Sequence, residues 1–191
     1  MVIIRCDLRL YLQMNDPDGN ELRRQSTLRK GGQFIVKGPN HVWSIDGHEK
    51  LSSFGFEIYG CIDAYSRYII WCYVGHSNRT QISVSKQYLE TVCAMGKFPK
   101  LIHSDMGREL ALLCVSHLFL RWTDKPDLSF HKACSFGTST KNQRIEAWWN
   151  FLANGQTDTC CTLFGGLDDR GLFDGGNIDK LCLQHIYITM L

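Results

Sequence analysis

Residues 41–48 read HVWSIDGH, and within them bulky and polar side chains alternate. In a β-strand this alternation places Trp43 and Ile45 on one face and Ser44 and Asp46 on the other. The first pair suits a packed core, whereas an acid inside a strand is a poor packing choice. The stretch therefore predicts a strand that carries core residues on one side and a candidate for chemistry, Asp46, on the other.

The segments that follow indicate an alternation of strands and helices. Residues 54–62 and 68–74 are β-rich, and the second is nearly all apolar, as expected of a central strand. Residues 77–80 supply capping groups for a helix that ends near Gly96. Further along, the patterns predict strands at residues 100–104 and 130–134 and helices at residues 109–120 and 142–152.

This order of elements predicts an α/β fold. Three consecutive strands can form an antiparallel meander, and strands joined through helices must lie parallel to their neighbours. The result is a mixed five-stranded sheet flanked by helices, which is the element order of the ribonuclease H-like fold. Residues 5–14 form a possible further helix, followed by a dense turn cluster at residues 15–20.

Composition places the chain among globular proteins of one-domain length. It has 191 residues, 44% of them hydrophobic, and a formal net charge of +2. Residues 1–40 hold seven Lys and Arg against four acids, so the remaining chain is close to neutral. Nine cysteines without a Cys-x-x-Cys pair, no signal peptide and no apolar run long enough for a membrane span predict an intracellular protein without a membrane partner. A nuclear location, in a eukaryote, is a further expectation that these features do not themselves establish.

Three acids occupy positions that suit chemistry better than packing. Asp46 lies inside a strand, Asp105 follows the fourth strand, and Glu146 lies in the last predicted helix. Carboxylates brought together repel one another unless cations lie between them, and Mg²⁺ or Mn²⁺ prefer such oxygen ligands. The alternative is a strand-end acid, a turn former and a surface charge that never meet.

Four segments, in this order, resemble the motifs of the integrase catalytic core family, the DDE integrases and transposases. They are GPNHVWSIDG at residues 38–47, GCIDAYSR at 60–67, SDMGRE at 104–109 and NQRIEAWW at 142–149. The similarity is greatest to integrase core domain-containing cellular proteins of transposable-element origin. It divides the chain into a helical and basic arm at residues 1–37, a catalytic core at 38–155 and a C-terminal helical extension of that core at 156–191.

The resemblance implies an enzyme, a polynucleotidyl transferase for divalent-metal-dependent DNA 3′-end cleavage and strand transfer. It assigns Asp46, Asp105 and Glu146 as the catalytic triad that binds two Mg²⁺ or Mn²⁺ ions. Glu109 is expected to support these ligands without binding metal itself. The implied partners are DNA and further copies of the chain, with no small-molecule cofactor.

Some features depart from the family pattern and favour an alternative function. Arg108-Glu109-Leu110 stands where relatives tend to have Thr-Glu-Asn, and no helix-turn-helix or zinc-binding region precedes the core. The alternative is a domesticated or truncated, catalytically inactive integrase-like domain that binds DNA or a protein.

Candidate DNA contacts form a weaker set. In the arm, the basic side chains either contact phosphates or belong to a solvated linker. Near the last helix, Trp148 and Trp149 are core residues or a stacking surface for bases. The candidate cations are Arg23, Arg24, Arg29, Lys30, Lys141 and Arg144.

Two other features remain open at this stage. The pairs His131/Cys134 and Cys182/His185 have zinc-ligand spacing, although packing is the favoured role. Asp63 and Arg67 can pair across a strand turn, as architecture or as function.

Overall fold

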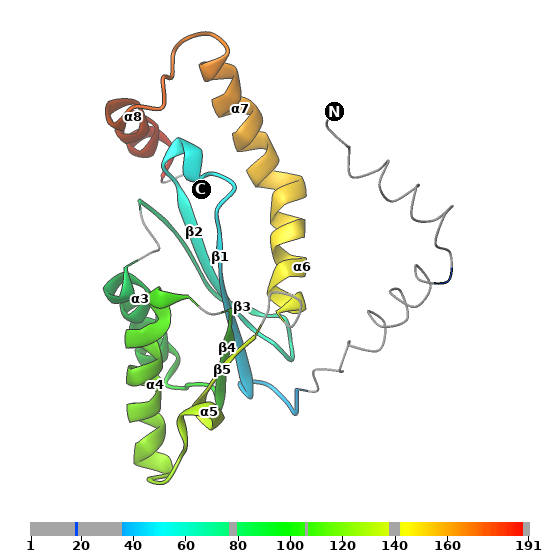
Figure 1. Cartoon of the computed structure of the whole chain (residues 1–191), viewed down its shortest axis with the longest axis vertical. Helices are drawn as coiled ribbons and strands as arrows, with labels where there is room; N and C mark the ends of the chain where they lie inside the picture. The colour runs from blue at the N-terminus through cyan, green and yellow to red at the C-terminus, as the bar shows by residue number, and fades with distance from the viewer. Residues whose placement is uncertain (1–17, 19–35, 77–79, 106, 138–141, 189–191) are drawn as a thin grey trace. The chain divides into compact units, whose positions relative to one another are not determined.

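The computed structural model describes residues 18, 36–76, 80–105, 107–137 and 142–188. The description below concerns the unit formed by residues 36–191 (Figure 1). The helix predicted at residues 5–14 lies outside the described residues.

The unit formed by residues 36–191 is built on one sheet. Its strands are β1 (Val42–His48), β2 (Glu57–Asp63), β3 (Ile69–Gly75), β4 (Leu101–Ser104) and β5 (Cys134–Phe136). Within the described residues they form a five-stranded sheet of order β3-β2-β1-β4-β5. β1, β2 and β3 pair antiparallel, whereas β4 lies parallel to both β1 and β5. This is the ribonuclease H-like arrangement, so the predicted fold class is confirmed.

Helices flank the sheet on both faces (Figure 1). α3 (Gln81–Met95) and α4 (Ala111–Asp124) pack against each other on one side, and α6 (Gln143–Leu152) lies against β1 and β2 on the other. α6 continues through the π-helical turn η4 (Ala153–Thr157) into α7 (Asp158–Asp168). The remaining elements are η1 (Ser52–Phe54), η2 (Arg108–Leu110), α5 (Phe130–Ala133) and α8 (Asn177–Tyr187).

The position of the fifth strand differs from the sequence prediction. Residues 130–134 were expected to be extended, but α5 occupies residues 130–133 and the strand covers only Cys134–Phe136. The reason is where its partner begins. β5 pairs in parallel with Ile102–Ser104, and β4 starts only at Leu101, so in this register residues 130–132 would have no strand beside them.

The alternation predicted for β1 is confirmed by the two cores. Trp43 and Ile45 are fully buried in a cluster that includes Tyr88 of α3 and Leu113 of α4. A second cluster, on the side of α6, contains Ile145 and further residues from β2 and α7. β1 therefore supplies a packed face towards α3 and α4 and a polar face towards α6.

Asp63 has an architectural role at the turn after β2. Its carboxylate accepts hydrogen bonds from the backbone N–H of Asn40 at 3.0 Å, and from the N–H and hydroxyl of Ser66 at 2.9 and 2.5 Å. Arg67 instead donates its backbone N–H to the Asp63 carbonyl at 2.8 Å, and in the described part of the chain no ion pair joins the two side chains. Of the two roles open for this pair, the structure supports architecture.

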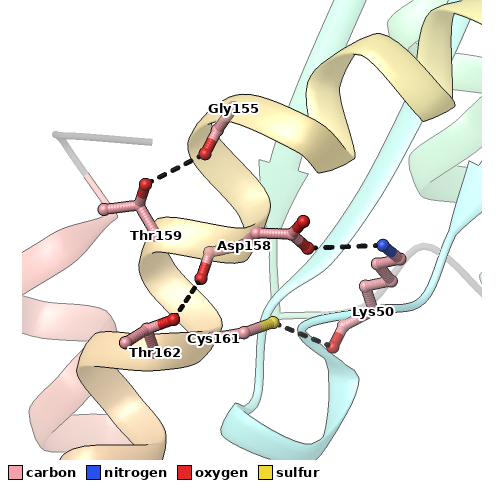
Figure 2. Close-up of polar contacts among 6 residues, drawn as sticks. All are labelled: Lys50, Gly155, Asp158, Thr159, Cys161 and Thr162. Atoms are coloured by element: carbon pink, nitrogen blue, oxygen red, sulfur yellow. Dashed lines mark hydrogen bonds and ion pairs between the residues drawn. The ribbon is translucent and has the colours of Figure 1, made fainter.

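The segment after β1 is tied to α7 by the contacts in Figure 2. Lys50 and Asp158 form an ion pair at 3.4 Å, and the Cys161 thiol lies 3.9 Å from the Lys50 carbonyl oxygen. Thr159 and Thr162 donate their hydroxyls to carbonyls one turn earlier. Because the ion pair is exposed, it contributes about 1 kcal/mol or less. No helix in the described ranges is long and apolar enough to cross a membrane.

Candidate active site

Three acids from separate parts of the sequence line one cleft, hereafter the acid cleft. Asp46 comes from β1, Asp105 from the residue after β4, and Glu146 from the first turn of α6. Glu109 of η2 lines the same cleft, which has a volume of about 550 Å³. Because β1 and β4 are parallel, their carboxyl ends bring Asp46 and Asp105 to the same end of the sheet.

α6 is anchored directly beside Asp46. The buried Asn142 donates its side-chain amide to the Ile45 carbonyl at 3.2 Å, immediately before the helix begins. Ile145, in the first turn of α6, is fully buried in the second core cluster. These two contacts fix the first turn of α6 and with it the position of Glu146 at the acid cleft.

Trp149 contacts Asp46, a role that the sequence did not predict. Its indole N–H donates to Asp46 Oδ2 at 2.9 Å, and its ring stacks on His48 with centroids 4.9 Å apart. Gly60 pairs with Asp46 across β1 and β2 and leaves room for the Trp149 ring. The sequence suggested only that one of the two tryptophans belongs to the core, and the bond to Asp46 became visible once β1 and α6 were placed together.

The electrostatics of the acid cleft favour a cation. The pKa of Asp46 is raised to about 7, first by burial and then by the negative charges of Asp105 and Glu146, while the Trp149 hydrogen bond opposes the rise. A carboxyl group with such a pKa is half protonated near neutral pH. A divalent cation in the cleft would favour its ionised form and reduce the mutual repulsion of the acids.

The residues present fit a hard divalent ion by their chemistry. Carboxylate oxygens dominate the lining, as Mg²⁺ and Mn²⁺ prefer. Tyr59 and His48 also line the cleft, and the Tyr59 hydroxyl and His48 Nε2 are buried without a hydrogen-bond partner in the described structure. In the described part of the chain, however, no three His, Cys, Asp or Glu side chains are grouped closely enough to form a ready metal site.

Replacing Trp149 by Phe tests its control of Asp46. Trp149→Phe keeps an aromatic ring but removes the N–H donor, so the pKa of Asp46 should rise further above 7. The measurement is an NMR titration of the Asp46 carboxyl group. Trp148→Phe is the matched control, because no hydrogen bond joins Trp148 to Asp46. Equal Asp46 titration curves for the two variants would contradict the assigned role.

The other candidate residues are not all gathered at the cleft. Arg144 is half-buried in the first turn of α6 and is not among the residues that line the acid cleft. Cys134 is buried in the core, whereas His131, Cys182 and His185 are exposed, so the described residues give no support to zinc binding. The remaining candidate cations, Arg23, Arg24, Arg29, Lys30 and Lys141, lie outside the described residues.

Comparison with protein families identifies the class to which this fold and cleft belong. Residues 33–191 match the family described as Integrase core domain. The chain therefore belongs to the integrase core domain family, as its four motifs predicted. No protein with a curated description matches the sequence.

Solved structures similar to the chain include retroviral proteins. A chain of the simian T-cell lymphotropic virus intasome, solved with PP2A regulatory subunit B56 gamma, is 17% identical with a TM-score of 0.44. The match covers 78% of this chain and 49% of that one, so this chain spans about half its length.

Two catalytic core domains are also similar. The HTLV-2 integrase catalytic core domain, in complex with magnesium in a trimeric form, is 18% identical with a TM-score of 0.43, over 78% of this chain and 86% of that one. The catalytic core domain of BIV integrase is 15% identical with a TM-score of 0.40, over 62% and 73% of the two chains.

Proposed function

We propose that the protein is a polynucleotidyl transferase that cleaves DNA at a 3′ end and joins that end to a second DNA. The observation that carries the proposal is the convergence of Asp46, Asp105 and Glu146 on one cleft from three motifs of the integrase core domain family. Residues 38–155 would form the catalytic core of this activity.

The reaction is an in-line displacement at a phosphodiester. An oxygen of water, or later of the DNA 3′ hydroxyl, attacks phosphorus and loses its proton, while the bond to the departing 3′ oxygen breaks and that oxygen gains a proton. Asp46, Asp105 and Glu146 would hold two Mg²⁺ or Mn²⁺ ions, which when bound neutralise developing charge and activate the attacking oxygen. Trp149 would hold the Asp46 carboxylate in a single orientation.

Glu109, which also lines the acid cleft, would have a supporting role. Glu109 extends from η2 towards Gly107, and a side chain on Gly107 would collide with the Glu109 carboxylate. This close packing suits a residue that keeps the segment after Asp105 in place.

In the active assembly, DNA and further copies of the chain would be the partners.

Nicking of supercoiled plasmid DNA in Mn²⁺ tests the proposal without knowledge of the natural DNA ends. The wild type should nick the plasmid, and Asp105→Asn and Glu146→Gln should each lose the activity while keeping the wild-type circular dichroism spectrum and, in EDTA, the wild-type thermal midpoint. Asp158→Asn is the charge-matched control, because Asp158 pairs with Lys50 outside the cleft and should keep full activity.

The second candidate is the binding module without catalysis, favoured by the absence of a ready ligand cluster among the described side chains. Mn²⁺ distinguishes the two functions, because an ion that binds the folded state raises its thermal midpoint by mass action. A wild-type protein that shows neither a Mn²⁺-dependent thermal shift nor nicking would reject the transferase and support the binding module.

A further inference from the structure

A second pocket, hereafter the basic pocket, is lined by cations from four segments of the chain. It contains Lys37, His41, Lys100, Arg121, Lys125 and Lys132, has a volume of about 650 Å³, and has no Asp or Glu among its described lining residues. Its cations come from the residues before β1 and β4, the end of α4, and α5. The nearly neutral net charge of the chain therefore conceals a local concentration of positive charge.

The basic pocket and the acid cleft lie at opposite ends of the same strands. Lys37 and His41 precede β1, and Lys100 precedes β4, whereas Asp46 and Asp105 lie towards the carboxyl ends of these two parallel strands. The two sites share no lining residue. A ligand of the basic pocket would therefore bind apart from the candidate catalytic acids.

Arg121 shows that the basic pocket is a built site. Its side chain is only 8% exposed, its Nε has no hydrogen-bond partner, and no ion pair joins it to a described acid. Burying a guanidinium group is costly unless an anion or acceptor compensates it. The last turn of α4 favours a cation at Arg121. The end of α4 does not explain why Lys37 and Lys100 line the same pocket, because these two residues precede β1 and β4.

A histidine in the basic pocket reports the positive potential there. The pKa of His41 is lowered, first by burial and then by the charges of Lys37, Lys100 and Arg121. The Nδ1 atom of His41 is also buried without a hydrogen-bond partner in the described structure. His41 and Arg121 thus line the same pocket, and each has a buried nitrogen without a hydrogen-bond partner in the described structure.

We propose that the basic pocket binds the phosphodiester backbone of a nucleic acid, at a site separate from the acid cleft. Arg and Lys are the side chains that contact phosphate, and an Arg fork can bind two phosphate oxygens together. Cations arriving from four segments suit a chain of phosphates better than one isolated ion. The choice of nucleic acid among polyanions rests on the proposed function, whereas the fit to phosphate rests on the pocket alone.

Fluorescence anisotropy with a labelled DNA duplex, in EDTA so that metal at the acid cleft does not contribute, tests the site. The double variant Lys100→Gln/Lys132→Gln should bind about tenfold more weakly, and its salt slope should fall by about two because each phosphate contact contributes about 0.9. Both lysines are exposed, so the fold should be unaffected. Lys86→Gln/Lys180→Gln removes the same charge outside the basic pocket and should bind like the wild type.

The outcomes separate this proposal from the proposed function. A wild-type protein that binds DNA in EDTA, loses affinity through Lys100→Gln/Lys132→Gln and yet never nicks DNA would refute only the transferase. A Lys100→Gln/Lys132→Gln variant with wild-type affinity and salt slope would overturn the basic-pocket proposal.

NMR of His41 adds a direct readout of occupancy. Duplex DNA in the pocket should raise the His41 pKa, because a nearby anion favours the charged imidazole. Inorganic phosphate is the second arm. A His41 pKa that responds to millimolar phosphate and not to DNA would show a site for the free ion and overturn the nucleic-acid proposal.

Discussion

Asp46→Asn is expected to reduce Mn²⁺-dependent DNA nicking by about 10³-fold or more. If Asp46 holds metal as proposed, its loss removes several kcal/mol of transition-state stabilisation, and each 1.36 kcal/mol is a factor of ten in rate. The substitution keeps an oxygen acceptor for the Trp149 N–H, so the local packing should survive. Nicking by purified Asp46→Asn at the wild-type rate would contradict the assignment.

The same variant should change the pH dependence of stability. The pKa of Asp46 is about 7 in the folded protein and 3.8 as the ordinary value, so protonation favours the fold. This contribution is fully present below pH 3.8 and is lost as pH rises through about 7. Without metal, Asp46→Asn should therefore be more stable than the wild type at pH 8.

In Mn²⁺ the wild type should instead be more stable than Asp46→Asn at pH 8. In the proposed site the ion would bind the deprotonated carboxylate, so its stabilisation of the wild type should grow as pH rises through about 7 and should be small for Asp46→Asn. Thermal midpoints at pH 5 and pH 8, each in EDTA and in Mn²⁺, give the comparison. A wild-type midpoint that responds to Mn²⁺ equally at both pH values would contradict the role of Asp46.

Gly60→Ala is expected to damage both the fold and the acid cleft. A Cβ at this position would lie 2.6 Å from Cζ3 of Trp148 and 2.8 Å from Cη2 of Trp149. Overpacking of this kind costs about 1–3 kcal/mol, and relief requires the indole rings to move. Movement of Trp149 would break its bond to Asp46, so nicking should fall together with the free energy of unfolding.

Urea unfolding and plasmid nicking of the same preparations measure the two losses. Gly165→Ala is the matched control, since its Cβ would meet nothing within 4 Å and alanine is the better helix former within α7. Gly165→Ala should unfold at the same or a higher urea concentration than the wild type. A Gly60→Ala protein with wild-type stability would show that the ring contacts are not as close as described.

Local sequence patterns were sufficient to predict the β1 alternation and the order of strands and helices. Period-two alternation is a short-range property, so Trp43 and Ile45 could be assigned to the core from neighbouring residues alone. The predicted strand at residues 130–134 was wrong because β-propensity carries no information on where the parallel partner β4 begins, which is at Leu101.

The sequence predicted those residues of the candidate site that lie in recognisable motifs, but not the contacts between distant residues. Asp46, Asp105 and Glu146 were named from spacing and family resemblance, and the structure brings them to one cleft. The hydrogen bond of Trp149 and the basic pocket involve residues that no local pattern connects. Arg121 and Lys37 are 84 positions apart in the sequence, and their proximity follows only from how β1, β4 and α4 pack.

The two faces of β1 also bear on how such a chain can change over generations. Trp43 and Ile45 are fully buried, so selection for a folded protein acts on them in any copy that is expressed. Asp46 is only half-buried, and its charge opposes folding at neutral pH, so selection for folding alone would favour its replacement. Stability therefore does not explain the aspartate on this strand, whereas a charge needed at the acid cleft does.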